Sequence, residues 1–251
     1  MIAPSLWTHA VYAMRQSRIV MFAFMVACTI VDVSLEQALG NSRSTDASSS
    51  IRDIGFTLTR PLHTLLVTNP THVDVLACIS STIIGAIALA GALYSCLYLR
   101  RFGIALVMYG VLLLRAALAA CTSLPRSPEY LHSDYDWPNP LVGNFIFLFS
   151  GHAAILAFYG HWLWCHGSRG SACFVHAFHA TQWVYLLATH GHYTADLVLG
   201  SLVGWYAVRF EPCATRLCRR AEAFVAKWEA NLKSASRSAA VPGSKAPQLR
   251  E

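Results

Sequence analysis

The sequence predicts an all-α, polytopic membrane protein with six transmembrane helices. Hydrophobic residues make up 55% of its 251 residues and charged residues only 13%, whereas a soluble domain carries about 25% charged residues. The second observation is a series of long apolar runs. Crossing the hydrocarbon core of a bilayer takes roughly 20 apolar residues. Such segments are expected to be helices, because a helix satisfies its own backbone hydrogen bonds in lipid.

Six runs have about this length, and each is taken as one span. They extend from Ile19 to Leu39, Val73 to Leu99, Ile104 to Cys121, Asn144 to Cys165, Ala172 to Thr189, and His192 to Val208. The first run carries Asp32 and Glu36 near its end and lacks a small-residue cleavage site. We therefore expect it to be a retained first span rather than a signal peptide.

The cationic residues predict the orientation of these spans. Fourteen of the 19 Lys and Arg residues lie before the first run, in the second and fourth connections, or after the sixth run. By the positive-inside rule, both termini are then cytoplasmic and the opposite face is lumenal. The net charge of +6 becomes a cytoplasmic collar that suits anionic lipid headgroups. No basic surface remains for nucleic acid.

Four regions follow from this organisation. We expect a cytoplasmic N-terminus at 1–18, a six-span membrane domain with the candidate site at 19–208, a basic amphipathic helix at 209–233, and a disordered tail at 234–251. Within the membrane domain, 51–70 is expected to form a short helix at the membrane interface, and 121–143, with four prolines, a loop. The eight cysteines do not suggest a disulfide framework. Cys213 and Cys218 are either palmitoylated or unmodified thiols.

Ionisable residues in the apolar runs form the candidate site. Arg115, His152, His192 and Asp196 are all expected within about two helical turns of the lumenal surface, and intramembrane ionisable groups are functional candidates. In "HYTAD", His192 and Asp196 are four residues apart, so the carboxylate can fix one imidazole tautomer and leave the other nitrogen as a base or nucleophile. His152, which follows Ser150 and Gly151, can then act as the general acid. The alternative to a catalytic role is that the two histidines only form hydrogen bonds between helices.

A metal site is the rival chemical interpretation. "HGH" at 190–192 and "HAFH" at 176–179 contain imidazole ligands, but no third ligand occurs at a recognised spacing. Neither HExxH nor CxxC is present. We therefore expect no metal and no other cofactor.

Several sequence stretches resemble a known family. "FSGHAA" and "HGHYTADLVLG" resemble the two histidine motifs of the lipid phosphatase/phosphotransferase superfamily. The similarity is closest to the branch that contains sphingomyelin synthases and the plant phosphatidylcholine:diacylglycerol cholinephosphotransferases. Four stretches of this chain resemble stretches of the plant cholinephosphotransferases, and they occur in the same order in both. They are "DIGFTLTRPLHTLLVTNP", "LLRAALAACTSLPRSPEYL", "VGNFIFLFSGHAA" and "GHYTADLVLGSLVG". The resemblance covers about 51–205.

The resemblance implies a mechanism and a set of site residues. His192 would attack phosphorus, Asp196 would orient it, and His152 would protonate the departing alcohol, giving a phosphocholine-histidine intermediate without a metal. The residues implied to contact the substrate are Arg115, Asn144, Ser150, Gly151 and Tyr193. The partners would be phosphatidylcholine and diacylglycerol in the bilayer. The endoplasmic reticulum is the expected location and the Golgi the alternative, and the oligomeric state is left open.

Departures from the superfamily motifs narrow the substrate. Met108, Ala116, Phe149 and Leu186 stand where superfamily phosphatases carry lysine, proline, proline and arginine. Fewer cations favour a phosphodiester, which carries one negative charge, over a monoester dianion. The C-G-D that sphingomyelin synthases usually carry before S-G-H is absent, which weakens the case for ceramide. A ceramide acceptor, a phosphatase with water as acceptor, and a non-enzymatic membrane protein remain alternatives.

The loop before the fourth run also bears on the headgroup. It contains aromatic and acidic residues, namely Tyr130, Asp134, Tyr135, Asp136 and Trp137. Aromatic faces beside carboxylates bind quaternary ammonium groups. The alternative, which we favour slightly, is an ordinary interfacial belt of Trp and Tyr residues.

Overall fold

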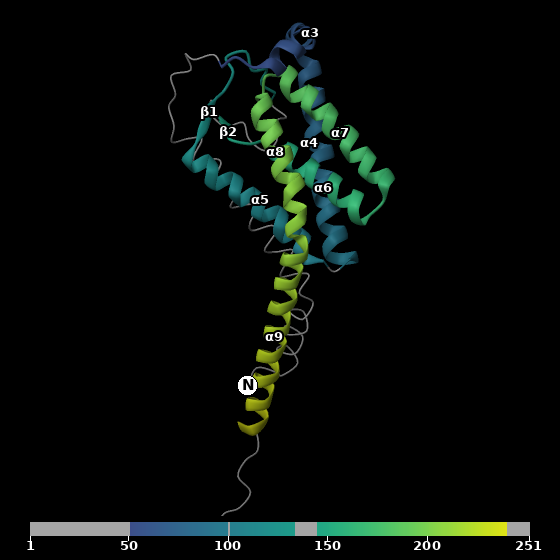
Figure 1. Ribbon diagram of the computed structural model, residues 1–251, viewed down its shortest axis with the longest axis vertical. Helices are drawn as coiled ribbons and strands as arrows, with labels where there is room; N and C mark the ends of the chain where they lie inside the picture. Colours follow the sequence, from purple (N-terminus) through teal and green to yellow (C-terminus); the bar gives the residue numbers. More distant parts are fainter. Residues whose placement is uncertain (1–50, 100, 134–144, 240–251) are drawn as a thin grey trace, which may run out of the picture.

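The computed structural model describes residues 51–99, 101–133 and 145–239, and within them it is built almost entirely from helices (Figure 1). These are α3 (Ile54–Thr68), α4 (Pro70–Leu93), α5 (Phe102–Cys121), α6 (Gly151–His166), α7 (Arg169–Ala188), α8 (Thr194–Ala207) and α9 (Glu211–Ala239). A π-helical turn, η1 (Tyr94–Tyr98), follows α4, and a 3₁₀ turn, η2 (Val208–Phe210), precedes α9. The expected all-α class is confirmed. The predicted first span, Ile19 to Leu39, lies outside the described residues.

One described helix is long and apolar enough to cross a membrane by length and composition. It runs from Pro70 to Cys96, and the apolar segment Phe102–Leu118 of α5 is shorter than a full span. Helix α8 has 14 residues, which extend only about 21 Å. The structure thus supports one of the six predicted spans by this criterion and gives the other described runs as helices.

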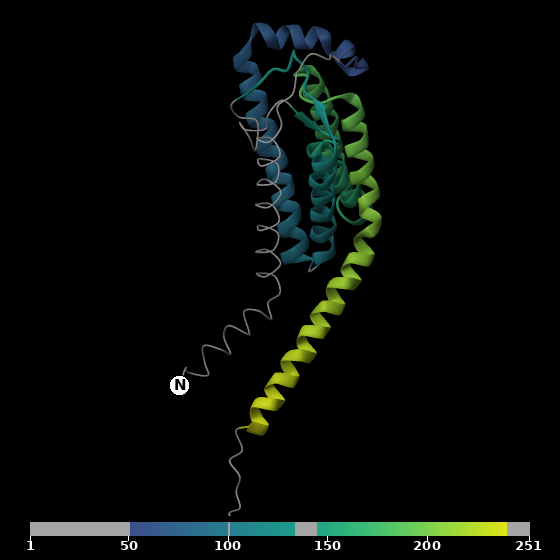
Figure 2. The same ribbon diagram turned by 90° about the vertical axis from the view of Figure 1, so that its left-hand side faces the viewer.

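Helix α6 lies at the centre of the bundle and packs most extensively against α7 and α8. Helix α3 lies across one end of the bundle, and α9 extends beyond the other end (Figure 2). The main core is formed by buried residues of α5, α6 and the end of α8, including Ile104, Met108, Phe158 and Trp162. This core fixes the position of α6, whose first turn carries the candidate residue His152.

Two helices begin later than the apolar runs predict. The run from Asn144 was expected to be helical throughout, but α6 begins at Gly151, where the Ser150 hydroxyl accepts a hydrogen bond from the Ala153 amide. Ser is a favoured N-cap because its oxygen satisfies an unpaired amide of the first turn. The preceding segment instead forms the short strand β2 (Phe145–Phe147), which pairs antiparallel with β1 (Ser123–Pro125). Aromatic residues favour such strands.

The second late start is that of α8. The predicted span began at His192, but the helix begins at Thr194 with extended backbone at Tyr193. His192 therefore lies in the turn before the helix and not on its face. At the other end of the chain, α9 continues to Ala239, six residues beyond the boundary expected at 233.

Two glycines allow α8 to approach α6 closely. A Cβ at Gly200 would lie 2.5 Å from the Ser150 carbonyl oxygen, and one at Gly204 would overlap the Ala154 carbonyl. The obstructing atoms are backbone, so they cannot rotate away. The absence of side chains at these positions lets the first turns of α6 and α8 come into contact.

The Gly200→Ala variant is expected to lower the melting temperature by several degrees, because overpacking against backbone costs about 1–3 kcal/mol. Gly110→Ala is the matched control, since a Cβ there meets nothing within 4 Å. Alanine is also the better helix former, so this variant should melt at or slightly above the wild-type temperature. Thermal unfolding of the purified proteins in one detergent provides the comparison. Equal melting temperatures for the two variants would contradict the packing argument.

Candidate active site

His192 and Asp196 form a short polar contact at the centre of the candidate site. The Nδ1 atom of His192 lies 2.6 Å from Oδ2 of Asp196. Asp196 is buried in the first turn of α8, and its Oδ1 has no hydrogen-bond partner in the described part of the chain. With Nδ1–H donating to the carboxylate, Nε2 of His192 keeps a lone pair for use as a base or nucleophile.

His152 faces this pair from the first turn of α6. The rings of His152 and His192 are 6.4 Å apart between centroids and nearly perpendicular, at 88°. A nucleophile approaches its target atom at about 3 Å, and a hydrogen bond to a leaving oxygen spans about 2.8 Å. The separation therefore suits one tetrahedral phosphoryl group held between a nucleophilic and a proton-donating imidazole.

Arg115 of α5 supplies a cation beside the start of α6. Its Nε donates to the Phe149 carbonyl at 3.3 Å, and a Cβ on Gly151 would lie 3.2 Å from the same nitrogen. The N-terminus of a helix attracts anions through its unpaired amides and its dipole. The guanidinium and the start of α6 together provide a positive environment next to His152.

Ser150 has a structural role in this arrangement. Its amide donates to the Asp196 carbonyl at 3.1 Å, and its hydroxyl caps α6. The residue before His152 is thus tied directly to the residue that holds His192. This link sets the relative positions of the two histidines.

Tyr193 and Asn144 are the other two residues predicted to contact the substrate. The buried Tyr193 donates its hydroxyl to the Pro125 carbonyl at 3.0 Å and packs against the Phe56 ring. Its hydroxyl thus anchors the loop after α5. Asn144 lies outside the described residues.

The residues considered for quaternary ammonium binding are only partly described. The Arg126 guanidinium lies over the Tyr130 ring, 4.2 Å from its centroid. One face of that ring therefore already contacts a cation of the chain. Asp134, Tyr135, Asp136 and Trp137 lie outside the described residues.

Asp53 is a site-positioning residue that the sequence analysis missed. Its Oδ1 accepts from the Gly55 amide at 2.7 Å and from the Thr194 hydroxyl at 2.6 Å, and its Oδ2 accepts from the Thr194 amide at 2.8 Å. One carboxylate therefore caps the N-termini of both α3 and α8. "IRDIGFT" carries a local signal for the first cap, since Asp commonly precedes a helix. No local signal points to a second helix 141 residues away.

The contact between α3 and the start of α8 is close. A Cβ on Gly55 would overlap Thr194 Oγ1 and would lie within 3 Å of the Leu187 side chain. The backbone of α3 therefore rests directly on the turn that carries His192. We call the Asp53–Thr194 contacts the clamp.

His190 is held in the same turn by two stacked rings. Phe56 and His63 lie on either side of its imidazole, each with its centroid 4.0 Å away. Its backbone φ is 54°, a left-handed conformation that is uncommon outside glycine. Burial, and then the neighbouring His63, lower the pKa of His190 to about 4, against the opposing effect of Glu129. The ring is therefore neutral at physiological pH.

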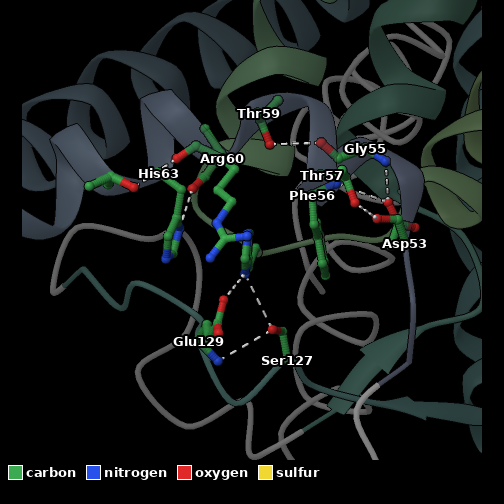
Figure 3. A network of polar contacts seen from close by, with 12 residues as sticks. Asp53, Gly55, Phe56, Thr57, Thr59, Arg60, His63, Ser127 and Glu129 are labelled. Atoms are coloured by element: carbon green, nitrogen blue, oxygen red, sulfur yellow. Dashed lines mark hydrogen bonds and ion pairs between the residues drawn. The ribbon is translucent and has the colours of Figure 1, made fainter.

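His63, Glu129 and His190 have the side-chain types of a metal site. Their ligand atoms lie within 4.8 Å of one another, and Figure 3 shows Glu129 and Ser127 below His63 in this network. The rings of His63 and His190, however, are stacked at an interplanar angle of 13°. A metal ion lies in the plane of each imidazole that binds it, so one ion cannot lie in both planes. Binding through both rings would require one to rotate, and His63 Nδ1 is held 2.8 Å from the Ala188 carbonyl oxygen.

Comparison with known proteins places the chain in a family. The family model AtPDCT1/2 matches residues 52–211. Phosphatidylcholine:diacylglycerol cholinephosphotransferase 2 of Arabidopsis thaliana is 32% identical over 157 residues, which is 62% of this chain and 52% of the relative. Phosphatidylcholine:diacylglycerol cholinephosphotransferase 1 of the same plant is 30% identical over 159 residues, 61% of this chain and 50% of the relative.

The matched region covers only part of the relatives but includes the whole described candidate site. The chain aligns with about half the length of these curated relatives, and no solved structure matches it. The matched segment begins beside Asp53 and ends at the first residue of α9, so it contains every described residue of the candidate site. Because the family model covers well over half of the 251 residues, the chain belongs to the AtPDCT1/2 family.

Proposed function

We propose that this protein is a membrane phosphotransferase that moves phosphocholine from phosphatidylcholine to diacylglycerol. The observation that carries the proposal is the pair of perpendicular histidines, His152 and His192, with Asp196 bound to the latter. The substrate class is that of the two Arabidopsis relatives, as their names state it. The active site would face the lumen of the endoplasmic reticulum, or of the Golgi, with both termini in the cytoplasm.

The proposed reaction proceeds in two steps that share one set of residues. In the first, Nε2 of His192 attacks phosphorus, the bond from phosphorus to the diacylglycerol oxygen breaks, and His152 gives that oxygen a proton. In the second, His152 removes the proton from the hydroxyl of another diacylglycerol, whose oxygen attacks phosphorus and breaks the bond to His192. His152 is therefore protonated again at the end of each cycle, as it was at the start.

Asp196 and Arg115 have supporting roles in this scheme. Asp196 keeps the proton of His192 on Nδ1, so the nucleophilic nitrogen faces the substrate. Arg115 and the N-terminus of α6 lie beside His152 and would be near the phosphoryl oxygens of a substrate held between the two histidines. A positive environment stabilises the charge that develops on these oxygens in the transition state.

The transfer reaction is tested with purified protein in vesicles. Headgroup-labelled phosphatidylcholine and a diacylglycerol of distinguishable chain length are supplied together, and labelled lipid and free phosphocholine are measured. We expect new labelled phosphatidylcholine to form faster than free phosphocholine, because positioning the acceptor alcohol can contribute about 7 kcal/mol or more. The rate should be unchanged by EDTA. The proposal would be contradicted by predominant formation of free phosphocholine, by transfer only to ceramide, or by release of phosphate from phosphatidic acid.

The catalytic roles predict a graded set of variants. His192→Ala and His152→Ala should each abolish transfer, because the nucleophile or the acid is removed. Asp196→Asn should leave a small measurable rate, about 10³–10⁴-fold below wild type, because orientation is lost rather than the nucleophile. His166→Ala, at the exposed far end of α6, is the control and should retain full activity. Near wild-type transfer by either catalytic histidine variant would contradict the mechanism.

The clamp predicts a further variant that separates capping from positioning. Asn caps helices as well as Asp, so Asp53→Asn should keep α3 capped while placing an amide donor against the Thr194 amide. We expect the kcat for transfer to fall about ten-fold or more, since small displacements of a reacting group are costly. KM and the melting temperature should stay near wild type.

Thr194 provides the matched controls for this test. Thr194→Val should also reduce kcat, because it removes the hydroxyl that donates to Asp53, whereas Thr194→Ser keeps that hydroxyl and should restore the rate. The double variant Asp53→Asn/Thr194→Val should lose little more than either single one, since both act on one contact. Additive losses, or a fall in melting temperature that accounts for the lost rate, would show that the clamp has no specific positioning role.

A further inference from the structure

Helix α3 connects the candidate membrane span to the candidate active site. It ends at Thr68, and the long apolar helix that could cross a membrane begins at Pro70. Helix α3 lies across the end of this long helix (Figure 2). If the segment from Pro70 crosses the bilayer, α3 must lie along the membrane surface at the end of that span.

The outward side of α3 is apolar. Ile54, Leu58 and Leu65 have exposed fractions of 69%, 75% and 54%, and Pro61 between them is also exposed. Their spacing of four, three and four residues places them on one stripe of the helix. A short helix with one exposed apolar stripe is typical of segments that lie in the interfacial plane of a membrane.

The charged residues around α3 are compatible with a phospholipid surface. Arg52 and Arg60 are exposed, and the single acidic residue of the segment 51–69, Asp53, is directed inward at Gly55 and Thr194. Arg60 extends on the same side of α3 as His63 (Figure 3), so lipid beside the outer stripe would meet no exposed carboxylate of this helix. The apolar stripe is also continued by exposed apolar residues at the start of the candidate span, such as Val75 and Ile79.

The inward side of α3 contacts the turn that carries the proposed nucleophile. Asp53 binds Thr194 two residues after His192, and Phe56 and His63 enclose His190 two residues before it. One helix therefore has a candidate lipid-facing stripe on one side and the catalytic turn on the other. A displacement of α3 would be transmitted to His192 through these contacts.

We propose that the outer stripe of α3, formed by Ile54, Leu58 and Leu65, binds the lipid surface next to the active site and thereby orients the His192 turn toward substrates in the bilayer. The second half of this inference rests on the proposed function. A second copy of the chain is a poorer occupant. Three side chains on a helix of 15 residues cannot supply the roughly 800 Å² per partner that a stable interface requires.

The lipid contact is tested without reference to activity. A benzophenone amino acid is introduced at Leu58 of the full chain, the protein is reconstituted in phosphatidylcholine vesicles, and the products of irradiation are identified by mass. We expect adducts with phospholipid at position 58. The control is the same amino acid at Pro128, an exposed loop position of the chain, which should give few or none. Crosslinks at position 58 to a second copy of the chain, or no lipid adduct there, would overturn the proposal.

The coupling to the site is tested with Leu58→Asp. The leucine side chain is largely exposed, so the change should leave the melting temperature unaltered, while a carboxylate resists contact with apolar lipid. In vesicles we expect transfer to fall about ten-fold, the effect of losing much of one apolar side-chain burial. With monomeric short-chain phosphatidylcholine and detergent-solubilised protein, the loss should be less than about two-fold. Leu58→Met is the control and should behave as wild type in both assays.

The two experiments distinguish the two proposals. Lipid adducts at position 58 from a protein that lacks transfer activity would refute the proposed function and leave the lipid contact intact. Full transfer by Leu58→Asp in vesicles, or an equal loss with both substrate forms, would refute the coupling and leave the proposed function intact.

Discussion

The contact between the first turns of α6 and α8 determines the geometry of the candidate site. Gly200 permits the backbones to meet, and the Ser150 amide then reaches the Asp196 carbonyl at 3.1 Å. His152 is two residues from one end of this hydrogen bond, and Asp196, at its other end, holds His192 through its side chain. The distance between the two imidazoles is therefore set by this backbone contact together with the short side-chain contact between Asp196 and His192. Catalytic groups that must act on one phosphorus atom require this kind of preorganisation.

The pairing of His192 with Asp196 was more predictable from the sequence than the local structure that brings the two side chains together. Apolar runs showed that His152, His192 and Asp196 occupy positions where ionisable groups are costly, and the pairing of His192 with Asp196 is present in the structure. Its structural basis, however, differs from the expected one. The pair was expected on one helix face, whereas His192 precedes α8 and bends back to reach the carboxylate. A spacing of four residues brings the groups together in both conformations.

The helix starts were mispredicted for a related reason. The apolar residues 145–149 are followed after only three residues by the apolar residues of α6, so the extent of the apolar run does not show where the helix begins. The boundary is set by the backbone amides of the first turn, which require an acceptor, and Ser150 supplies one. The clamp is still less predictable, because Asp53 and Thr194 are brought together by the packing of α3 on α7 and the start of α8. Contacts of such long sequence separation follow from the tertiary fold and not from local sequence.

The distribution of charge around the site supports a diester in preference to a dianion. The positive features beside His152 are Arg115 and the start of α6, while the Arg126 guanidinium lies over the Tyr130 ring and His190 is neutral between two rings. A phosphomonoester dianion would need more compensation than this, since an uncompensated buried charge is expensive. A phosphodiester brings one negative charge, and its second alcohol is a lipid that can leave and be replaced by another. If the proposed function is correct, this small number of positive groups disfavours a phosphatase substrate and favours the exchange of one diacylglycerol for another.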